Sequence, residues 1–290
     1  MEITAGVVKQ LREKTGVGMM ECKSALVEAR GDLSEAEKIL RKKGLAAAAN
    51  KAGRATGEGI IATAASSSGD AAVLLELNCE TDFAARGADF QALVTASVDA
   101  ALESGAATDG SAPSESSREA LLDAPSASGR SLRQTIGEAV GKIGENMQLR
   151  RYVKFQREAP TSVLASYIHT GGKIGVLVEV ESAGGSLPDG LLRDLAMHIA
   201  AAAPRYVTRD EVSAKVLADE QEIARDQALK AGKPAQVVEK IVTGRVDKFL
   251  SEVTLVEQPF VKDPDKTVRQ LLGDGVRVRR FARFVLGEGL

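Results

Sequence analysis

The feature that most constrains the fold of this chain is an approximate internal repeat. Each half contains a predicted β-hairpin, then a helix, an insert, a second helix and a closing strand. The hairpins span 59–77 and 162–180, where short apolar runs flank a turn rich in Ser or Gly. The closing strands lie near 150–155 and 279–284, and each begins with a pair of arginines. Because the period is far longer than that of a solenoid repeat, we predict two related α+β subdomains.

The residues before the first hairpin predict a small helical bundle. Three short amphipathic segments lie within 1–45, and we expect the third helix to end at Gly44, because glycine commonly follows a helix. Residues 46–58 contain few large apolar side chains, and they predict a tether between the bundle and the repeat.

The two halves carry different inserts. Residues 105–129 are rich in Ser, Ala, Gly and Pro, and they predict a mobile loop. In the second half, two apolar helical stripes flank the turn at 231–234 and predict an antiparallel helical coiled-coil projection. The expected domains are the bundle and tether at 1–55, a first core subdomain at 56–158, a second core subdomain at 159–208 and 252–290, and the coiled-coil insertion at 209–251.

Composition narrows the classes of function. The chain has 290 residues, with 38 Lys and Arg against 40 Asp and Glu, so its net charge is −2. A protein that mainly wraps duplex nucleic acid usually has one dominant basic face. We therefore interpret the arginine pairs of the closing strands as solvated sheet faces, and we expect no direct nucleic-acid binding. No apolar run is long enough to span a bilayer, so we expect no membrane partner.

Catalytic and metal-binding signatures are weak. Cys79, His169 and Asp82 could act as nucleophile, base and orienting group, but nothing in the sequence brings them together. The two cysteines and two histidines lack the spacing of metal ligands, so we expect no cofactor. His198 lies within a predicted helix and is interpreted as a packed side chain. The well-separated cysteines and the absence of a signal-like N-terminus predict a cytoplasmic location.

The stretch 78–83 is the most suggestive of function. It follows an apolar strand and precedes a helix, so we expect Asp82 and Phe83 on a loop or a first helical turn. Large apolar side chains are usually buried, and an exposed one often marks a contact with another molecule. The equivalent corner after Val180 has no Asp-Phe pair, so the fold does not demand one. We therefore predict that Asp82 and Phe83 form the tip of a probe aimed at a partner.

Other contact candidates are less distinctive. Met19 and Met20 follow a Gly-rich turn, and we expect at least one of them to be buried. His169 lies at the end of a predicted strand, where we expect it to be exposed. A contact with a partner and the absence of any functional role are equally open for it.

Together these segments resemble the bacterial elongation factor Ts family, the nucleotide exchange factors for elongation factor Tu. The resemblance covers nearly the whole chain. It is carried by residues 11–23, 78–83, 169, 174–178, 196–198 and 258–261. It implies a three-helix bundle of the ubiquitin-associated type (UBA-like), a core of two subdomains and a coiled-coil arm. It also implies a translation factor that promotes the release of GDP from elongation factor Tu, and not an enzyme.

The resemblance assigns roles to individual residues. It implies that one segment enters the GTPase domain of the partner and dislodges Mg²⁺, and that three other residues make supporting contacts. The implied entering segment is Thr81, Asp82, Phe83 and Ala84, and the implied supporting contacts are Met19, Met20 and His169. Ala84 is a departure, because the family more often has Val there. A further helical module follows the position of Leu290 in many members, and its contact is not transferred to this chain.

Two alternatives stay open. The arginine pairs and the helical arm are also compatible with an RNA- or ribosome-associated scaffold that has no exchange activity. The sequence does not decide whether the arm pairs two copies of the chain into a dimer.

Overall fold

A computed structural model describes residues 3–105, 112–125, 129–183 and 187–289. The chain divides into two compact units, and each unit contains a three-stranded sheet, so the fold is α+β as predicted. Unit 1 comprises Met1–Gln156, Thr170–Ile174 and Phe284–Leu290, and unit 2 comprises Arg157–His169 and Gly175–Arg283. The predicted domain boundaries are finer than this division and stay a prediction.

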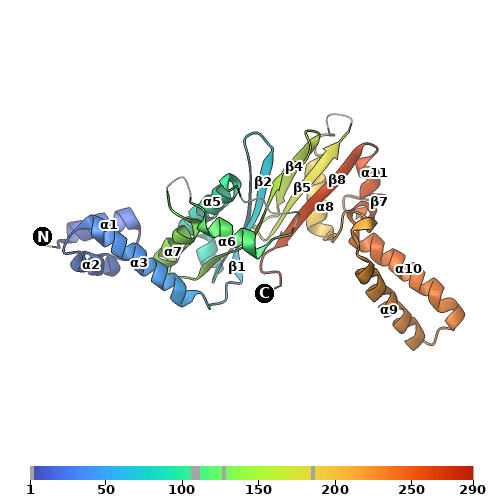
Figure 1. Cartoon of the computed structure of the whole chain (residues 1–290), viewed down its shortest axis with the longest axis horizontal. Helices are drawn as coiled ribbons and strands as arrows, with labels where there is room; N and C mark the ends of the chain where they lie inside the picture. The colour runs from blue at the N-terminus through green and yellow to red at the C-terminus, as the bar shows by residue number, and fades with distance from the viewer. Residues whose placement is uncertain (1–2, 106–111, 126–128, 184–186, 290) are drawn as a thin grey trace. The chain divides into compact units, whose positions relative to one another are not determined.

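The sheet of unit 1 (Figure 1) has the order β1-β2-β3. Every residue of its central strand, β2, is buried. Helices α4 to α7 follow β2 in the chain, and α5 and α7 supply apolar side chains to the core beside it. The bounds are β1 (Glu58–Ala65), β2 (Ala71–Cys79), α4 (Asp82–Arg86), α5 (Ala88–Glu103), α6 (Glu115–Asp123), α7 (Leu132–Ile143) and β3 (Met147–Gln156).

Three helices precede this sheet, namely α1 (Ala5–Thr15), α2 (Met19–Glu28) and α3 (Leu33–Lys51). They share a small core of their own, made of Val8, Leu11, Cys22, Ala25, Leu26, Ala29, Ala36 and Leu40. The chain continues from α3 into β1 within the same unit.

The prediction that the third helix ends at Gly44 is wrong, because α3 continues to Lys51. Gly44 is buried where α3 crosses α7. A Cβ on Gly44 would lie 3.2 Å from the carbonyl oxygen of Gly137, and a Cβ on Gly141 would lie 2.9 Å from the Cα of Gly44. Glycine is needed here because the two helix backbones pass too closely for a larger side chain, and not because the helix stops.

The prediction of a mobile loop at 105–129 is wrong in its central part, where α6 forms. Ser114 caps this helix by accepting a hydrogen bond from Ser117 N at 3.2 Å. Leu121 is fully buried, and the Tyr152 hydroxyl donates to the Ser117 carbonyl oxygen at 3.2 Å. The composition of this segment did not reveal that it contains a helix, which Ser114 caps and the buried side chain of Leu121 anchors. Residues 106–111 and 126–128 lie outside the described part of the chain.

Unit 2 repeats the arrangement around a sheet of order β4-β5-β8. Helix α8 packs on β4, and α9 and α10 lie side by side (Figure 1). Alanines of α9 share a small core with valines of α10. The bounds are β4 (Ser162–Ile168), β5 (Ile174–Ser182), α8 (Leu191–Ala202), α9 (Ala214–Lys230), α10 (Ala235–Val253), β6 (Pro259–Phe260), β7 (Asp263–Thr267), α11 (Val268–Leu272) and β8 (Val276–Val285). No helix among the described residues is long and apolar enough to cross a membrane.

The arginine pairs of the closing strands are not solvated sheet faces, which corrects the sequence-based interpretation. In unit 1, Glu76 of β2 is fully buried, and its carboxylate accepts from Arg150 Nη1 at 2.9 Å and from Arg151 Nε at 2.6 Å. In unit 2, Glu179 of β5 is also fully buried and accepts from Arg280 Nε at 2.9 Å. A buried carboxylate must be paired, so both cores require these arginines.

The residues that follow each closing strand donate a further backbone hydrogen bond to one of these two carboxylates. Glu158, the second residue after β3, donates its N–H to Glu179 Oε1 at 2.8 Å. Gly287, the second residue after β8, donates its N–H to Glu76 Oε1 at 2.9 Å. Each buried glutamate therefore accepts from arginine and from the chain that leaves the other repeat.

We predict opposite effects of two helical Gly→Ala substitutions. Gly141→Ala should destabilise unit 1 by about 1–3 kcal/mol, because its new Cβ meets the backbone of α3. Gly244→Ala in α10 has nothing within 4 Å and should stabilise its helix by about 0.5–1 kcal/mol. Urea unfolding followed by circular dichroism measures both. A gain in stability from Gly141→Ala would contradict the close crossing of α3 and α7.

Candidate functional site

The site is the corner between β2 and α5. The ladder between β2 and β3 ends at the pair Cys79 and Met147, and the chain then turns into α4. Thr81 is the N-cap of α4, with φ −130° and ψ 156°, and its Oγ1 accepts from Ala84 N at 3.2 Å. Asp82 and Phe83 therefore lie in a first helical turn, as the sequence predicted.

Phe83 is the most exposed large apolar side chain of this corner, with 86% of its surface accessible. Ala85 is buried and Ala84 packs partly against the core of unit 1, so the short helix is anchored on one side. A phenylalanine in water forgoes about 2 kcal/mol of burial free energy. The arrangement can supply that free energy to a partner that buries the ring.

Asp82 carries the charge of the tip. Its carboxylate pairs with Arg86 at 2.9 Å, one helical turn along α4, and both side chains are exposed. The pair leaves the tip with no net charge and is open to competition by a partner.

Two glutamates that the sequence analysis missed hold the corner. Glu145, between α7 and β3, accepts from Thr81 N at 3.0 Å and from Thr81 Oγ1 at 2.6 Å. Glu80 accepts from Asn146 N at 2.6 Å, and this N–H, helped by Arg54, holds the pKa of Glu80 below its usual value. The signal was present as Glu145-Asn146 just before the closing strand, but a sequence does not reveal which segment such a pair meets.

Cys79, Asp82 and His169, the conceivable nucleophile, orienting group and base, each have other contacts within their own unit. Cys79 Sγ lies 3.1 Å from the Thr81 carbonyl oxygen, and burial, reinforced by nearby Glu145, raises the pKa of this thiol to about 12. Asp82 pairs with Arg86, and His169 belongs to unit 2, where its Nδ1 lies 3.0 Å from the Tyr167 hydroxyl. Within the described residues of unit 1, no hydrogen bond joins the side chains of Cys79 and Asp82.

The other histidine is packed, as predicted. His198 is fully buried, its Nε2 lies 2.9 Å from Gln258 Oε1, and its Nδ1 accepts from Val261 N at 3.3 Å. Burial lowers the pKa of His198, so the neutral ring is favoured. No group of three or more His, Cys, Asp or Glu in the described segments could hold a metal ion.

The prediction that Met19 or Met20 is buried is wrong, because Met19 is 42% and Met20 is 74% exposed. Both lie in the first turn of α2, and Cys22, Ala25 and Leu26 fill the bundle core instead. His169 is exposed at the end of β4. The candidate contact residues are therefore accessible, with the methionines and the corner in unit 1 and His169 in unit 2.

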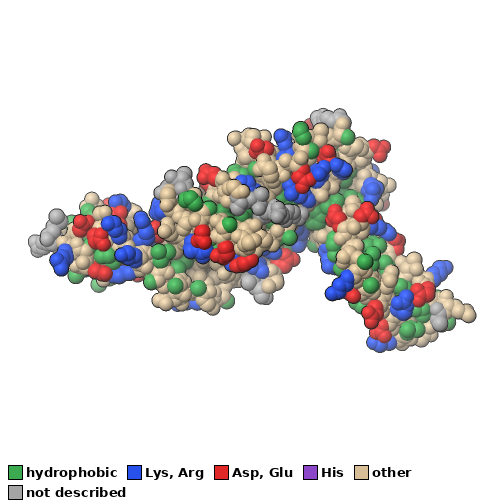
Figure 2. Space-filling view, in the orientation of Figure 1, with side chains coloured by type: hydrophobic (Ala, Val, Ile, Leu, Met, Phe, Trp, Pro, Cys, Tyr) green, Lys and Arg blue, Asp and Glu red, His purple; other side chains and the backbone are tan. Residues whose placement is uncertain are grey.

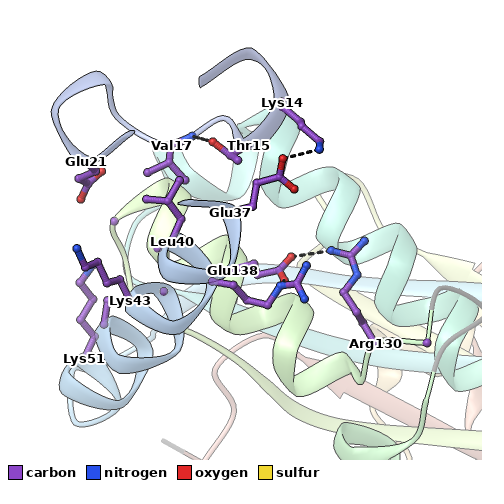
Figure 3. Close-up of a pocket in the computed structure, with 16 residues that line it drawn as sticks. Lys14, Thr15, Val17, Glu21, Glu37, Leu40, Lys43, Lys51, Arg130 and Glu138 are labelled. Atoms are coloured by element: carbon purple, nitrogen blue, oxygen red, sulfur yellow. Dashed lines mark hydrogen bonds and ion pairs between the residues drawn. The ribbon is translucent and has the colours of Figure 1, made fainter. Parts of the chain in front are cut away.

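A groove of about 830 Å³ lies between α3, α7 and the residues around Arg130 (Figure 3). Half of the residues that line it are charged, and several of these pair with one another. Lys14 pairs with Glu37, and Arg130 pairs with Glu138 at 2.9 Å. The groove therefore offers weaker evidence of a ligand than the corner, where an apolar side chain is unpartnered.

Acidic and basic side chains share the one face of the molecule that Figure 2 draws. On the face shown in Figure 2, basic and acidic side chains are interspersed, with no continuous basic stripe. This pattern agrees with the near balance of acidic and basic residues in the sequence.

Comparison with known proteins gives a consistent family. The family model described as "Elongation factor TS" matches residues 80–288. Curated relatives named "Elongation factor Ts" match throughout. The chain is 48% identical over 290 residues to the protein of Alkalilimnicola ehrlichii, covering 100% of this chain and 94% of the relative. The chain is 48% identical over 291 residues to the protein of Methylococcus capsulatus, with the same coverage of both proteins. It is 44% identical over 296 residues to the protein of Clostridioides difficile, covering 99% of this chain and 94% of the relative.

We predict that Cys79 resists alkylation in the folded protein. With a pKa of about 12, the thiol is protonated at pH 8 and reacts only as pH rises toward that value. Mass spectrometry of the Cys79 peptide after iodoacetamide treatment measures the effect, and the urea-unfolded chain is the control. Labelling of the folded and unfolded chains at equal rates at pH 8 would contradict the buried, protonated thiol.

Proposed function

The chain belongs to the elongation factor Ts family, and from that premise we propose that it is a guanine-nucleotide exchange factor for elongation factor Tu in translation. The observation that carries the proposal is Phe83, an exposed aromatic ring on an anchored corner. The repeat supports it, because the corresponding corner of unit 2 has no Asp-Phe pair.

The proposed mechanism is displacement and not bond cleavage. The segment from Thr81 to Ala84 enters the GTPase domain of the partner and dislodges Mg²⁺, which ordinarily bridges nucleotide and protein oxygens. Without the ion, the phosphate charge is poorly neutralised and GDP leaves, so that GTP can rebind. Burial of the Phe83 ring supplies on the order of 2 kcal/mol. The coupling is reciprocal, so GDP weakens binding of the factor as much as the factor weakens binding of GDP.

The remaining parts supply binding. We propose that α1 to α3 form the UBA-like bundle of the family and contact the same GTPase domain through Met19 and Met20. His169 contacts another domain of the partner, and α9 with α10 forms the coiled-coil arm. Whether that arm pairs two copies of the chain stays open, and a cytoplasmic location stays a prediction. Both cysteines are free and buried, which agrees with a reducing compartment.

The alternative, an RNA- or ribosome-associated scaffold, has less support. It was motivated by the arginine pairs, and Arg150, Arg151 and Arg280 pair with buried glutamates instead of presenting a basic face. Salt-sensitive retention on RNA without any effect on GDP release would favour it.

We predict that Phe83→Ala slows catalysed GDP release with little change in stability. The ring is exposed, so its loss removes the wedge and leaves the core intact. If about 2 kcal/mol of burial is lost in the complex, release slows by roughly 30-fold. Release of labelled GDP from elongation factor Tu measures the rate, and thermal unfolding measures stability.

Val163→Ala is the matched control, because it truncates an exposed apolar side chain of β4. It should leave GDP release unchanged. If Phe83→Ala also exchanged at the wild-type rate, Phe83 would be a bystander. If the wild-type protein failed to accelerate release at any concentration, the exchange function itself would be wrong.

A further inference from the structure

We propose that Glu145 is a positioning residue that aims Phe83, an inference that rests on the proposed exchange function. Glu145 lies between α7 and β3, outside the segment that presents Phe83. Its two carboxylate oxygens are both occupied by Thr81, one by the N–H and one by the hydroxyl. Among the described residues of the corner, no other side chain accepts hydrogen bonds from two donors of the same residue.

The direction of Phe83 depends on how Thr81 is held. Helix α4 has only five residues, and so short a helix has little stability of its own. Its orientation is set where it starts, at the N-cap. The Thr81 hydroxyl donates to Glu145 and therefore turns a lone pair toward Ala84 N, which it caps at 3.2 Å. Glu145 thus controls both the position of Thr81 and its ability to cap.

A second contact runs in the opposite direction. Glu80 accepts from Asn146 N at 2.6 Å, while Glu145 accepts from Thr81 N at 3.0 Å. These reciprocal bonds continue the pairing of β2 and β3 past its last backbone pair, Cys79 with Met147. Charge-assisted bonds of this kind are stronger than neutral ones, so the corner is stiff where a β-ladder would otherwise fray.

The second repeat serves as an internal control. Aligning Glu76 with Glu179 and Arg150 with Arg279 places Ala183 at the position of Glu80 and Gly275 at the position of Asn146. There the corner closes by a backbone bond, from Ala183 N to the Gly275 carbonyl oxygen at 2.8 Å. The residue at the position of Glu145 is Asp274, which is exposed.

The fold can therefore close this corner without a pair of glutamates. The glutamates occur in the copy that carries Phe83, so their role is tied to the tip. Without Glu145, Thr81 loses the acceptor of two donors and the corner samples other orientations. The ring then points into the partner only part of the time, and the exchange-competent fraction falls. Because the other proposed contacts remain, the maximal rate should fall more than the apparent affinity.

The first test needs no partner. Hydrogen–deuterium exchange of peptides covering 78–86 compares the wild type with Glu145→Ala and Glu145→Gln in the full chain. We expect faster exchange at Thr81 and Ala84 in Glu145→Ala, and near wild-type protection in Glu145→Gln, which keeps one acceptor. Amides of α5 should not change. Unaltered protection of Thr81 and Ala84 in Glu145→Ala would overturn the proposal.

The second test is a double-mutant cycle on GDP release from elongation factor Tu, with Phe83→Leu as the second substitution because it keeps part of the side chain. We expect Glu145→Ala to lower the maximal rate about tenfold in the wild-type background and less than about twofold in the Phe83→Leu background. Glu145→Gln should restore most of the rate. An equal loss in both backgrounds would show general destabilisation and overturn the positioning role.

Glu119→Ala is the matched control, since it removes a carboxylate paired with Arg118 and Arg133 in the same unit but away from the corner. It should leave the maximal rate unchanged, and a loss equal to that of Glu145→Ala would also count against the proposal. If the wild-type protein does not accelerate release, the exchange function fails, and the deuterium-exchange result still decides whether Glu145 holds Thr81.

Discussion

Two buried carboxylates organise both sheets of this protein. Glu76 and Glu179 lie at equivalent positions of central strands and are fully buried. Removing one partner of a buried ion pair typically costs about 3–5 kcal/mol, so each carboxylate ties its sheet to the arginines of the third strand. The requirement accounts for Arg150 and Arg151 in β3 and for Arg280 in β8, which pair with these carboxylates. Arg279 pairs instead with Glu158 and Glu181.

The corner that bears Phe83 shows how the repeat has been adapted. One copy closes the end of its sheet with a backbone hydrogen bond, and the other uses Glu80 and Glu145 beside the short helix α4. The same fold thus carries an exposed aromatic ring at this corner in unit 1, whereas the sequence of unit 2 has no Asp-Phe pair there. Small residues complete the corner of unit 1, since Ala84 and Ala85 let α4 lie close to the core.

Much of the fold could be predicted from local pattern. The hairpins, the helices that follow them and the exposure of Phe83 all depend on short-range signals, namely alternation, turn residues and an apolar residue at a corner. What could not be predicted depends on partners distant in sequence. Gly44 looked like a helix stop because the crossing of α7 is invisible locally. Glu145 was not singled out from the sequence because its partner Thr81 lies far along the chain. The arginine pairs were misread for the same reason, since Glu76 is hidden within an apolar run.

The bond from Gly287 to Glu76 also has a consequence for biosynthesis. Chains are made from the N-terminus, so β1, β2 and β3 are complete well before residue 287 has been added. Until then, the carboxylate of Glu76 has its arginines but lacks the backbone donor. The hydrogen bonding of Glu76 is therefore completed only after Gly287 has been added. This bond joins residues far apart in the sequence, and contacts of that kind slow folding.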